Sequence, residues 1–329
     1  MILAGDVGGT NTRLGVFSFE GGRLVGNGEE QVPSRGRSGL SEIVSAFLEG
    51  QRVPIRAAAF GIAGPVRGGR VEATNLPWVV DAQAMSRELG IPGLFLLNDL
   101  EANAWGIPIL EPRDLLTLNP GDSAASGNAA IIAAGTGLGE AGLFWNGEQH
   151  VPFGTEGGHS SFAPETEREI RLLAYLERKY GHVSWERVLS GPGLVELYMF
   201  LRDTEGPEGE GDDPLQAPDP AAEIAARALA KTCRLCAEAL GLFVELYGSE
   251  AGNVALKHLS TGGLYLGGGI APKILEALKG PAFMARFKGK GRMEKLLSSM
   301  PVRIILNDKA GLLGAARCAA LRGLSEGRA

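Results

Sequence analysis

The first hundred residues alternate between short apolar runs and amphipathic segments. Apolar runs at 2–4 and 14–17 enclose a glycine-rich stretch, which predicts two strands joined by a tight turn. Apolar side chains recur at helical spacing over 40–48, which predicts an amphipathic helix. The same reasoning predicts strands at 57–63, 70–74 and 94–97, a helix at 82–89 with Asp81 as its N-cap, and a helix through Ala102 and Trp105. Strands alternating with helices in this way are typical of the α/β class.

A second block repeats the plan of the first. Residues 129–133 are apolar, residues 135–139 form a second glycine-rich turn, and residues 141–144 are apolar again. Two similar strand–turn–strand units at the starts of two α/β blocks indicate an internal duplication. We expect a nucleotide to bind between the two units.

The rest of the chain is mostly helical in pattern. Residues 203–220 differ, because they are acidic and rich in Pro and Gly, which predicts a solvated loop without chemistry. Helices are predicted at 165–180, 191–201 and 221–247. A strand at 262–266 is followed by a glycine turn and then by a helix that Pro272 starts. The last two predictions are a strand at 302–306 and a helix at 311–321.

Composition narrows the functional classes. The chain has 329 residues, enough for two domains, and it is 44% hydrophobic with a formal charge of −6. Lys and Arg do not cluster, which argues against nucleic acid as a partner. No apolar run approaches the roughly 20 residues that span a bilayer, and the N-terminus lacks the basic region of a signal peptide. We therefore expect a cytoplasmic protein without a membrane partner.

Cysteine usage fits the same compartment. Cys233, Cys236 and Cys318 are an odd number without the spacing of a disulfide framework. The first two form a C-x-x-C pattern, but it falls inside the predicted helix at 221–247 and has no second pair. Buried thiols on a helix face are the favoured interpretation, and a redox or zinc site is the alternative.

The turn after the first strand carries the most informative residues. Gly8 and Gly9 allow backbone N–H groups to approach an anion closely. Asp6, at the end of the strand, is placed to hold a divalent cation directly or through water, and Thr10 and Asn11 add short donors. The pattern predicts a phosphate and magnesium site. An ordinary Gly-Gly hairpin, with Asp as a turn former, is the alternative.

Glycine turns follow three separate predicted strands, around Gly8, Gly135 and Gly268. The sequence contains no P-loop pattern, and no dinucleotide-binding pattern follows the first strand. Both of those nucleotide folds therefore lose their main support. Three turns of this kind, one with Asp and two with Thr, together favour a nucleotide site of another type.

Five motifs occur in order along the chain: D-x-G-G-T-N at 6–11, N-D at 98–99, G-T-G-L-G at 135–139, E-G-G-H at 156–159 and G-G-G-I at 267–270. With these and residues 181–193, the chain resembles, nearly end to end, bacterial glucokinases of the hexokinase-like branch of the actin, sugar-kinase and heat-shock ATPase superfamily. The resemblance implies two ribonuclease-H-like α/β domains with a central cleft. We expect the smaller domain at 1–109 plus 308–329 and the larger at 110–307.

The resemblance also implies an activity, namely ATP-dependent phosphorylation of glucose at the 6-hydroxyl to give glucose 6-phosphate and ADP, with Mg²⁺, in a homodimer. Asp99 is then the general base, and phosphoryl transfer to a hydroxyl does need a proton acceptor. The implied sugar contacts are Asn75, Asn98, Asp99, Glu156, His159 and Glu186. The implied ATP contacts are Gly5, Asp6, Val7, Gly8, Gly9, Thr10, Asn11, Gly135, Thr136, Gly137, Leu138, Gly268, Gly269 and Ile270, with Asp6 also at the magnesium ion.

Several of these residues have simpler interpretations. Asp99 would serve equally well as a plain helix N-cap, and Glu186 as a surface charge in a helical segment. Glu156 and His159, three residues apart, suit two convergent hydrogen bonds to ring hydroxyls, with a zinc site as the alternative. Glu140 directly follows the second glycine turn, where a carboxylate weakens ATP binding unless it points away.

Other functions compete with this one. The nearest is a kinase for another hexose, such as mannose, fructose or an N-acetylated amino sugar. A sugar-sensing transcription factor is less favoured, because the glycine hairpin begins at residue 5 and leaves no room before it for a DNA-binding helix pair. An actin-like or chaperone-like ATPase switch without a sugar substrate is the third.

Overall fold

The computed structural model describes residues 1–51, 53–206 and 212–323, and the chain divides into two compact units. The first unit comprises Met1–Asp114, Val151–Gly154 and Asn307–Ala329, and the second comprises Leu115–His150 and Thr155–Leu306. The sequence predicted domains at 1–109 with 308–329 and at 110–307. Two parts of those predictions lie outside the described residues: 207–211 in the acidic loop and 324–329 at the C-terminus.

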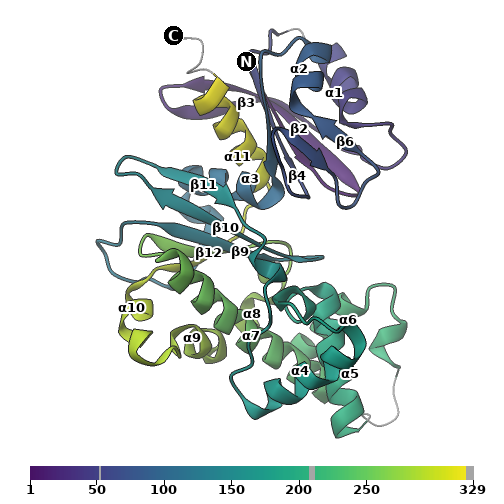
Figure 1. Ribbon diagram of the computed structural model, residues 1–329, viewed down its shortest axis with the longest axis vertical. Helices are drawn as coiled ribbons and strands as arrows, with labels where there is room; N and C mark the ends of the chain where they lie inside the picture. The colour runs from purple at the N-terminus through teal and green to yellow at the C-terminus, as the bar shows by residue number, and fades with distance from the viewer. Residues whose placement is uncertain (52, 207–211, 324–329) are drawn as a thin grey trace. The chain divides into compact units, whose positions relative to one another are not determined.

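A mixed sheet with the strand order β3-β2-β1-β4-β7 forms the centre of the first unit (Figure 1). β2 is antiparallel to β1 and β3, whereas β4 is parallel to β1 and β7 is parallel to β4. The strands are β1 (Ile2–Val7), β2 (Asn11–Glu20), β3 (Arg23–Pro33), β4 (Ala57–Ile62) and β7 (Gly93–Asn98). A separate pair consists of β5 (Arg70–Glu72) and β6 (Val79–Asp81).

Helices cover both faces of this sheet, as the apolar side chains of β1 require. Leu3 and Val7 pack in one core with α1 (Leu40–Glu49) and α2 (Ala82–Leu89). Ile2 and Ala4 pack in a second core with α3 (Asp99–Gly106) and α11 (Ala310–Cys318), which Figure 1 shows on the other side of the sheet. Because side chains alternate along a strand, Asp6 emerges on the side of α3 and α11.

Glycines allow α3 and α11 to cross at very short range. A Cβ atom on Gly106 would lie 2.3 Å from the carbonyl oxygen of Ala310, and one on Gly314 would lie 1.8 Å from that of Ala102. Neither position can carry a side chain unless the helices separate. The crossing brings Gly311 against Asp6, because a Cβ there would lie 3.3 Å from Asp6 Oδ2.

A second mixed sheet has the order β11-β10-β9-β12-β13-β8, and all of it except residues 151–154 of β11 belongs to the second unit. β9 and β10 form an antiparallel hairpin, β12 is parallel to β9, β13 is parallel to β12, and β8 is antiparallel to β13. A hairpin followed by two parallel strands therefore occurs in both sheets. The strands are β8 (Leu115–Asn119), β9 (Ala129–Ala134), β10 (Leu138–Trp145), β11 (His150–Gly154), β12 (Gly263–Gly267) and β13 (Val302–Ile305).

Helices of the second unit bury a large apolar core against alternate residues of β9, such as Ala130 and Ile132. The helices are α4 (Glu167–Tyr180), α5 (Gly191–Glu205), α6 (Pro220–Ala230), α7 (Arg234–His258), α8 (Leu275–Leu278), α9 (Pro281–Lys288) and α10 (Glu294–Ser299). Short 3₁₀ segments are η1 (Ile107–Ile109), η2 (Pro112–Asp114), η3 (Gly157–His159), η4 (Trp185–Arg187), η5 (Pro214–Gln216), η6 (Ala271–Ile274) and η7 (Gly291–Met293), and the π-helical η8 (Ala319–Gly323) follows α11.

The segment predicted as one helix at 221–247 consists of two helices. α6 ends where Lys231 takes a left-handed φ of 57°, and α7 begins after Cys233, whose Sγ accepts a hydrogen bond from Cys236 N at 3.1 Å. The prediction was wrong because the apolar spacing continues across the break. Cys236 and Cys318 are buried, Cys233 is partly buried, and all three are free thiols. Pro272, expected to start an α-helix, lies in η6 instead.

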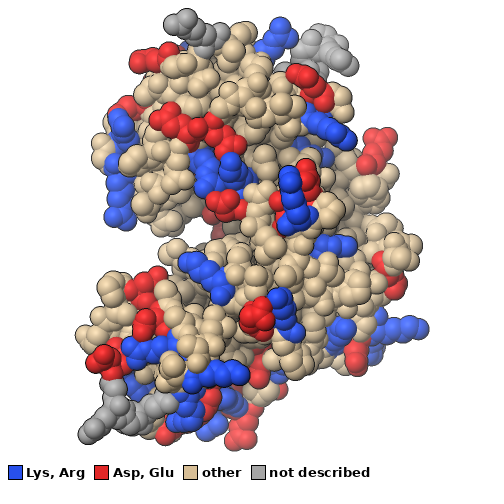
Figure 2. Space-filling model, turned by 180° about the vertical axis from the view of Figure 1, so that it is seen from behind, with Lys and Arg blue, Asp and Glu red and all other residues tan. Residues whose placement is uncertain are grey.

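Two observations bear on the kind of partner, one from the described helices and one from the face drawn in Figure 2. In the part of the chain that the structure describes, no helix is both long and apolar enough to traverse a bilayer. Figure 2 shows acidic and basic side chains intermingled on the face that it draws. On this face an anionic ligand therefore depends on local donors rather than on a broad positive field.

Candidate active site

The first glycine turn joins β1 to β2 and is fixed by hydrogen bonds. Gly8 N donates to Asn11 O at 2.9 Å, and the buried Ser34 donates its hydroxyl to Gly8 O at 2.7 Å. Neither Gly8 nor Gly9 has a positive φ, so the primed turn of an ordinary Gly-Gly hairpin does not explain them. A Cβ on Gly9 would lie 2.8 Å from Asn75 Cβ, so the turn and Asn75 are in contact.

Asp6 lies at the end of β1 beside other charged groups. The pKa of its carboxyl group is raised to about 6, first by burial and then by the neighbouring Asp99, whereas Arg13 acts in the opposite direction. Arg13 Nη2 is itself engaged by Asp308 Oδ2 at 3.0 Å. Asp6 and Asp99 thus form an acidic pair at one end of the first sheet, with Arg13 partly committed elsewhere.

Asn98 and Asp99 occupy different roles where β7 passes into α3. Asn98 is the N-cap, because its Oδ1 accepts a hydrogen bond from Leu100 N at 2.9 Å, and its Nδ2 donates to Gly64 O at 3.1 Å. Asp99 is the first residue of the helix, so the plain N-cap interpretation applies to Asn98 instead. Leu100 N also lies 2.9 Å from Asp99 Oδ1.

The second glycine turn joins β9 to β10 and is fixed by residues from helical segments. Gly135 N donates to Gly137 O at 2.8 Å, and Gly191 N, at the start of α5, donates to Gly135 O at 2.8 Å. Leu138 N donates to Glu186 Oε2 at 3.0 Å. A Cβ on Gly137 would lie only 2.4 Å from that oxygen, so this glycine is required for the approach of Glu186.

Glu156, His159 and Glu186 converge on one place in the second unit. His159 Nε2 lies 3.9 Å from Glu156 Oε2, and His159 Nδ1 lies 3.9 Å from Glu186 Oε1. The side chains of Glu156 and His159 are 60% and 61% exposed, so both are accessible to a ligand. The interpretation of Glu186 as an unattached surface charge does not hold, since it binds Leu138 N.

The third glycine turn lies against the second. Ile270 N donates to Ala134 O at 3.2 Å, and Gly268 has a φ of 78°. A Cβ on Gly268 would lie 2.3 Å from the same carbonyl oxygen. The ends of the parallel strands β9 and β12 thus bring the Gly135 turn and the Gly268 turn together, with Gly268 and Gly269 exposed.

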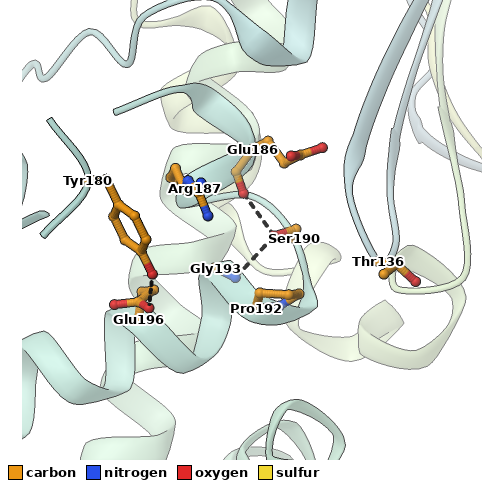
Figure 3. Close-up of a pocket in the computed structure, with 8 residues that line it drawn as sticks. All are labelled: Thr136, Tyr180, Glu186, Arg187, Ser190, Pro192, Gly193 and Glu196. Atoms are coloured by element: carbon orange, nitrogen blue, oxygen red, sulfur yellow. Dashed lines mark hydrogen bonds between the residues drawn. The ribbon is translucent and has the colours of Figure 1, made fainter. Parts of the chain in front are cut away.

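A small pocket of about 80 Å³ opens beside the second turn (Figure 3). Thr136 and Glu186 lie on one side of it, and Tyr180 and Glu196 lie on the other. Tyr180 donates its hydroxyl to Glu196 Oε1, and Ser190 links Glu186 O to Gly193 N. The pocket therefore borders the Glu186 side chain and the turn that it fixes.

Glu140 does not project into the second turn. It is 2% exposed and packs against Gly157 and α7, so it is not presented to a ligand of the turn. The other three histidines contact backbone or hydroxyl oxygens: His150 contacts Gly127 O, His182 contacts Ser161 Oγ, and His258 contacts Val254 O.

The residues around Asp6 fit a magnesium ion that arrives with a nucleotide. Mg²⁺ is usually held by one or two carboxylates together with substrate phosphates and water, rather than by a cage of protein ligands. Asp6 and Asp99 supply two neighbouring carboxyl groups, and burial together with the charge of Asp99 raises the pKa of Asp6. Among the described residues, no group of three or more His, Cys, Asp or Glu side chains forms a metal cluster.

Sequence reasoning missed two residues of the first unit. Ser34 donates to Gly8 O of the first turn from 26 positions further along the chain, and no local pattern marks it. Asp308 had a signal, because Leu-Asn-Asp occurs at 97–99 and again at 306–308, each time between a strand and a helix. In the second copy Asn307 Oδ1 accepts from Lys309 N at 2.9 Å, as Asn98 does from Leu100 N.

Comparisons with known proteins agree with this arrangement. A family model described as Glucokinase matches residues 3–322. A curated glucokinase from Nostoc sp. is 44% identical, with 97% of this chain and 99% of the relative aligned. This chain belongs to the glucokinase family. The crystal structure of glucokinase from an Antarctic psychrotroph matches with a TM-score of 0.86 at 30% identity, covering 97% of this chain and 98% of that one.

Family membership confirms the predicted family and fold class, the actin-like ATPase and hexokinase fold. A crystal structure of a ROK family glucokinase from Streptomyces griseus in complex with glucose and AMPPNP shares this fold, with a TM-score of 0.62 at 20% identity and coverage of 97% and 99%. The transcription-factor and ATPase-switch alternatives lose their support. The roles of individual site residues remain predictions.

Proposed function

We infer that this chain is a glucokinase, transferring the terminal phosphoryl group of ATP to the 6-hydroxyl of glucose and producing glucose 6-phosphate and ADP. The observation that carries the inference is the glucokinase match over residues 3–322, the stretch that contains all five motifs. A structural neighbour crystallised with glucose and AMPPNP supports the same pair of substrates.

In this proposal Asp99 accepts the proton of the 6-hydroxyl. It is the first residue of α3, next to the capped turn that Asn98 holds in place. A general base must reach the hydroxyl and stay ionised at the working pH. The charge of Asp6 nearby disfavours two ionised carboxylates. A magnesium ion held by Asp6 with the phosphates of ATP supplies the compensating positive charge.

Glu156, His159 and Glu186 hydrogen-bond other hydroxyls of the sugar, with Asn75 and Asn98 as further contacts. The convergence of the first three at 3.9 Å suits neighbouring hydroxyls on one ring. A site of this kind discriminates strongly, because a sugar without the matching hydroxyl leaves these polar groups unpaired.

The backbone of the glycine turns receives ATP. Residues 5–11 and 135–138 contact the phosphates through those N–H groups that the turns do not use internally, and the exposed Gly268 and Gly269 with Ile270 face the adenosine. We also propose a cytoplasmic location, which the three free thiols support. A homodimer follows from the family resemblance, and light scattering of the purified protein measures it directly.

A panel of hexoses under saturating ATP tests this function. Glucose is expected to give the highest kcat/KM, with mannose, fructose and N-acetylglucosamine at least tenfold lower. A higher kcat/KM for one of those sugars would assign the chain to that substrate. ATP turnover that does not depend on any sugar would contradict the proposal.

A further inference from the structure

The turn that carries Glu156 and His159 rests on the carboxyl group of Glu140. A Cβ on Gly157 would lie 1.9 Å from Glu140 Oε2 and 2.8 Å from its Cδ. The Glu140 carboxyl group therefore occupies the space that a side chain at 157 would fill. Thr155 adds a second link, because its hydroxyl donates to Glu140 O at 2.9 Å.

The same turn is short and internally bonded, so a displacement at Gly157 moves all of it. η3 (Gly157–His159) is a single 3₁₀ turn in which His159 N donates to Glu156 O at 3.0 Å. Ser160 N and Ser160 Oγ both donate to Gly157 O, at 2.9 and 2.6 Å. The position of Gly157 thus fixes where Glu156 and His159 present their side chains.

Glu140 is close to a second buried acid, Glu250 of α7, whose charge and carboxyl oxygens raise the pKa of Glu140. Glu140 Oε1 is itself buried without a hydrogen-bond partner in the part of the chain that the structure describes. Glu250 is 0% exposed, and it accepts hydrogen bonds from Lys257 Nζ at 3.2 Å and Asn253 Nδ2 at 2.7 Å. Lys257 is the cation that acts on both acids, and Lys290 acts more weakly on Glu250. Two buried negative charges beside one lysine are unfavourable, so the pair retains a proton.

The proton belongs on Glu140. The pKa of Glu140 is raised to about 8, first by burial and then by the charge of Glu250, whereas Lys257 acts in the opposite direction. Burial also raises the pKa of Glu250, but Asn253 and Lys257 are hydrogen-bonded to it and oppose this. Glu250 therefore keeps the negative charge, and Glu140 is the neutral member of the pair.

We propose that the neutral carboxyl group of Glu140 is a positioning element for sugar binding, which holds the Gly157 turn in place and releases it when that carboxyl group ionises. This inference rests on the proposed function, in which Glu156 and His159 contact the sugar. Ionisation of Glu140 adds repulsion from the charge of Glu250. Glu140 is then displaced away from Glu250 and toward the turn at Gly157, which it already contacts.

The test is the pH dependence of the KM for glucose between pH 6.5 and 9.5 at saturating ATP and Mg²⁺. In the unmodified protein, KM is expected to rise at least fivefold, with a midpoint near pH 8, while kcat at saturating glucose changes less than twofold. The Glu140→Gln variant keeps a neutral side chain beside Glu250, so its KM at pH 6.5 stays within about twofold and the rise disappears. Glu140→Ala removes the support, so KM is raised at every pH.

A variant at Lys257 tests in which direction the midpoint of the KM rise shifts when a nearby positive charge is removed. Lys257→Met removes the cation that favours ionisation, so the midpoint of the KM rise is expected to move to higher pH. Glu156, His159 and Glu186 are unchanged in all three variants. Glu167→Gln, an exposed glutamate on α4, is the charge-matched control and should leave the profile unaltered.

Thermal unfolding gives a readout that does not need a substrate. An acid whose pKa is raised in the folded state stabilises less as pH increases from its unfolded to its folded pKa. The melting temperature of Glu140→Gln relative to the unmodified protein should therefore increase between about pH 4.5 and 8 and then level off.

Either of two outcomes overturns the inference: a KM that does not rise, or a rise that persists in Glu140→Gln. Both leave glucose phosphorylation intact, so they are distinct from failure of the proposed function, in which no sugar-dependent turnover is seen in any variant. In that case a melting difference that does not depend on pH overturns the assignment of the proton to Glu140.

Discussion

The two glycine hairpins share one strand arrangement but hold their carboxylates differently. In the first, Asp6 belongs to β1 itself, where burial and Asp99 raise its pKa to about 6. In the second, Glu186 comes from η4 and accepts a hydrogen bond from Leu138 N. A carboxylate built into a strand without a cation destabilises the fold and is ready for a metal ion. A carboxylate delivered from another segment fixes the turn that it touches.

Asp99→Asn is expected to have the largest effect, because it removes the proposed proton acceptor and keeps the shape. We expect kcat to fall about 10³-fold, with glucose affinity within a fewfold, as measured by coupled assay and by calorimetry. Asp81→Asn is the matched control, since Asn caps α2 as well as Asp does. Turnover within tenfold of normal would exclude Asp99 as the base.

Asp6→Asn tests how the carboxylate of the first hairpin affects both catalysis and the free energy of unfolding. We expect kcat to fall about 10²-fold and the Mg²⁺ requirement to increase, as measured by magnesium titration of activity. The same variant should lose activity but gain stability. The raised pKa of Asp6 means that its stabilising contribution is lost as pH rises through about 6, so at pH 8 the variant should be more stable by on the order of 2 kcal/mol.

The stability difference for Asp6→Asn should diminish below pH 6 and disappear near pH 4, which thermal unfolding across this range measures. Glu20→Gln, exposed at the far end of β2, removes the same charge without burial and serves as control. A variant that is less stable than the original at pH 8 would contradict the picture of a strained carboxylate.

Glu186→Gln tests the second hairpin, where the carboxylate is satisfied. The amide still accepts from Leu138 N, but a charged hydrogen bond becomes a neutral one, worth about 1–2 kcal/mol. We expect kcat/KM for glucose to fall about tenfold, with the Mg²⁺ requirement unchanged. If Glu186→Gln shifts the magnesium titration as Asp6→Asn does, the carboxylate of the second hairpin also affects the metal ion, and the proposed difference between the hairpins is wrong.

Two alanine substitutions within the second turn give the smallest expected effects and separate the two substrates. Gly137→Ala places a Cβ 2.4 Å from Glu186 Oε2 and should raise the KM for glucose severalfold. Gly135→Ala meets nothing within 4 Å in the protein, so any effect should come from the phosphates and appear in the KM for ATP. Equal effects on both constants in both variants would argue against separate roles.

Local patterns in the sequence were sufficient for most of the elements. Asp81 was predicted as a helix N-cap, and its Oδ1 accepts from Ala84 N at 2.8 Å. The strands β1, β4, β7, β9 and β12 occur where apolar runs end at glycine or polar residues. These predictions depend on contacts a few residues apart, which the sequence displays directly.

Features that depend on distant contacts were not predictable. The break at Lys231 lies within unbroken helical spacing, so apolar periodicity could not locate it. Strand alternation places Glu140 on the same face as Leu138, but its partner Glu250 is 110 positions away, on a helix whose orientation no local pattern gives. The contact of Arg13 with Asp308 spans 295 positions.

The crossing of α3 and α11 has a consequence for synthesis on the ribosome. Residues 310–318 complete a core whose other members lie mainly in the first 105 residues. The N-terminal sheet therefore leaves the exit tunnel with one face uncovered and waits while some two hundred further residues are translated. A nascent chain stalled shortly before Ala310 should be a substrate for chaperones that recognise exposed apolar strands, although its second unit is already complete.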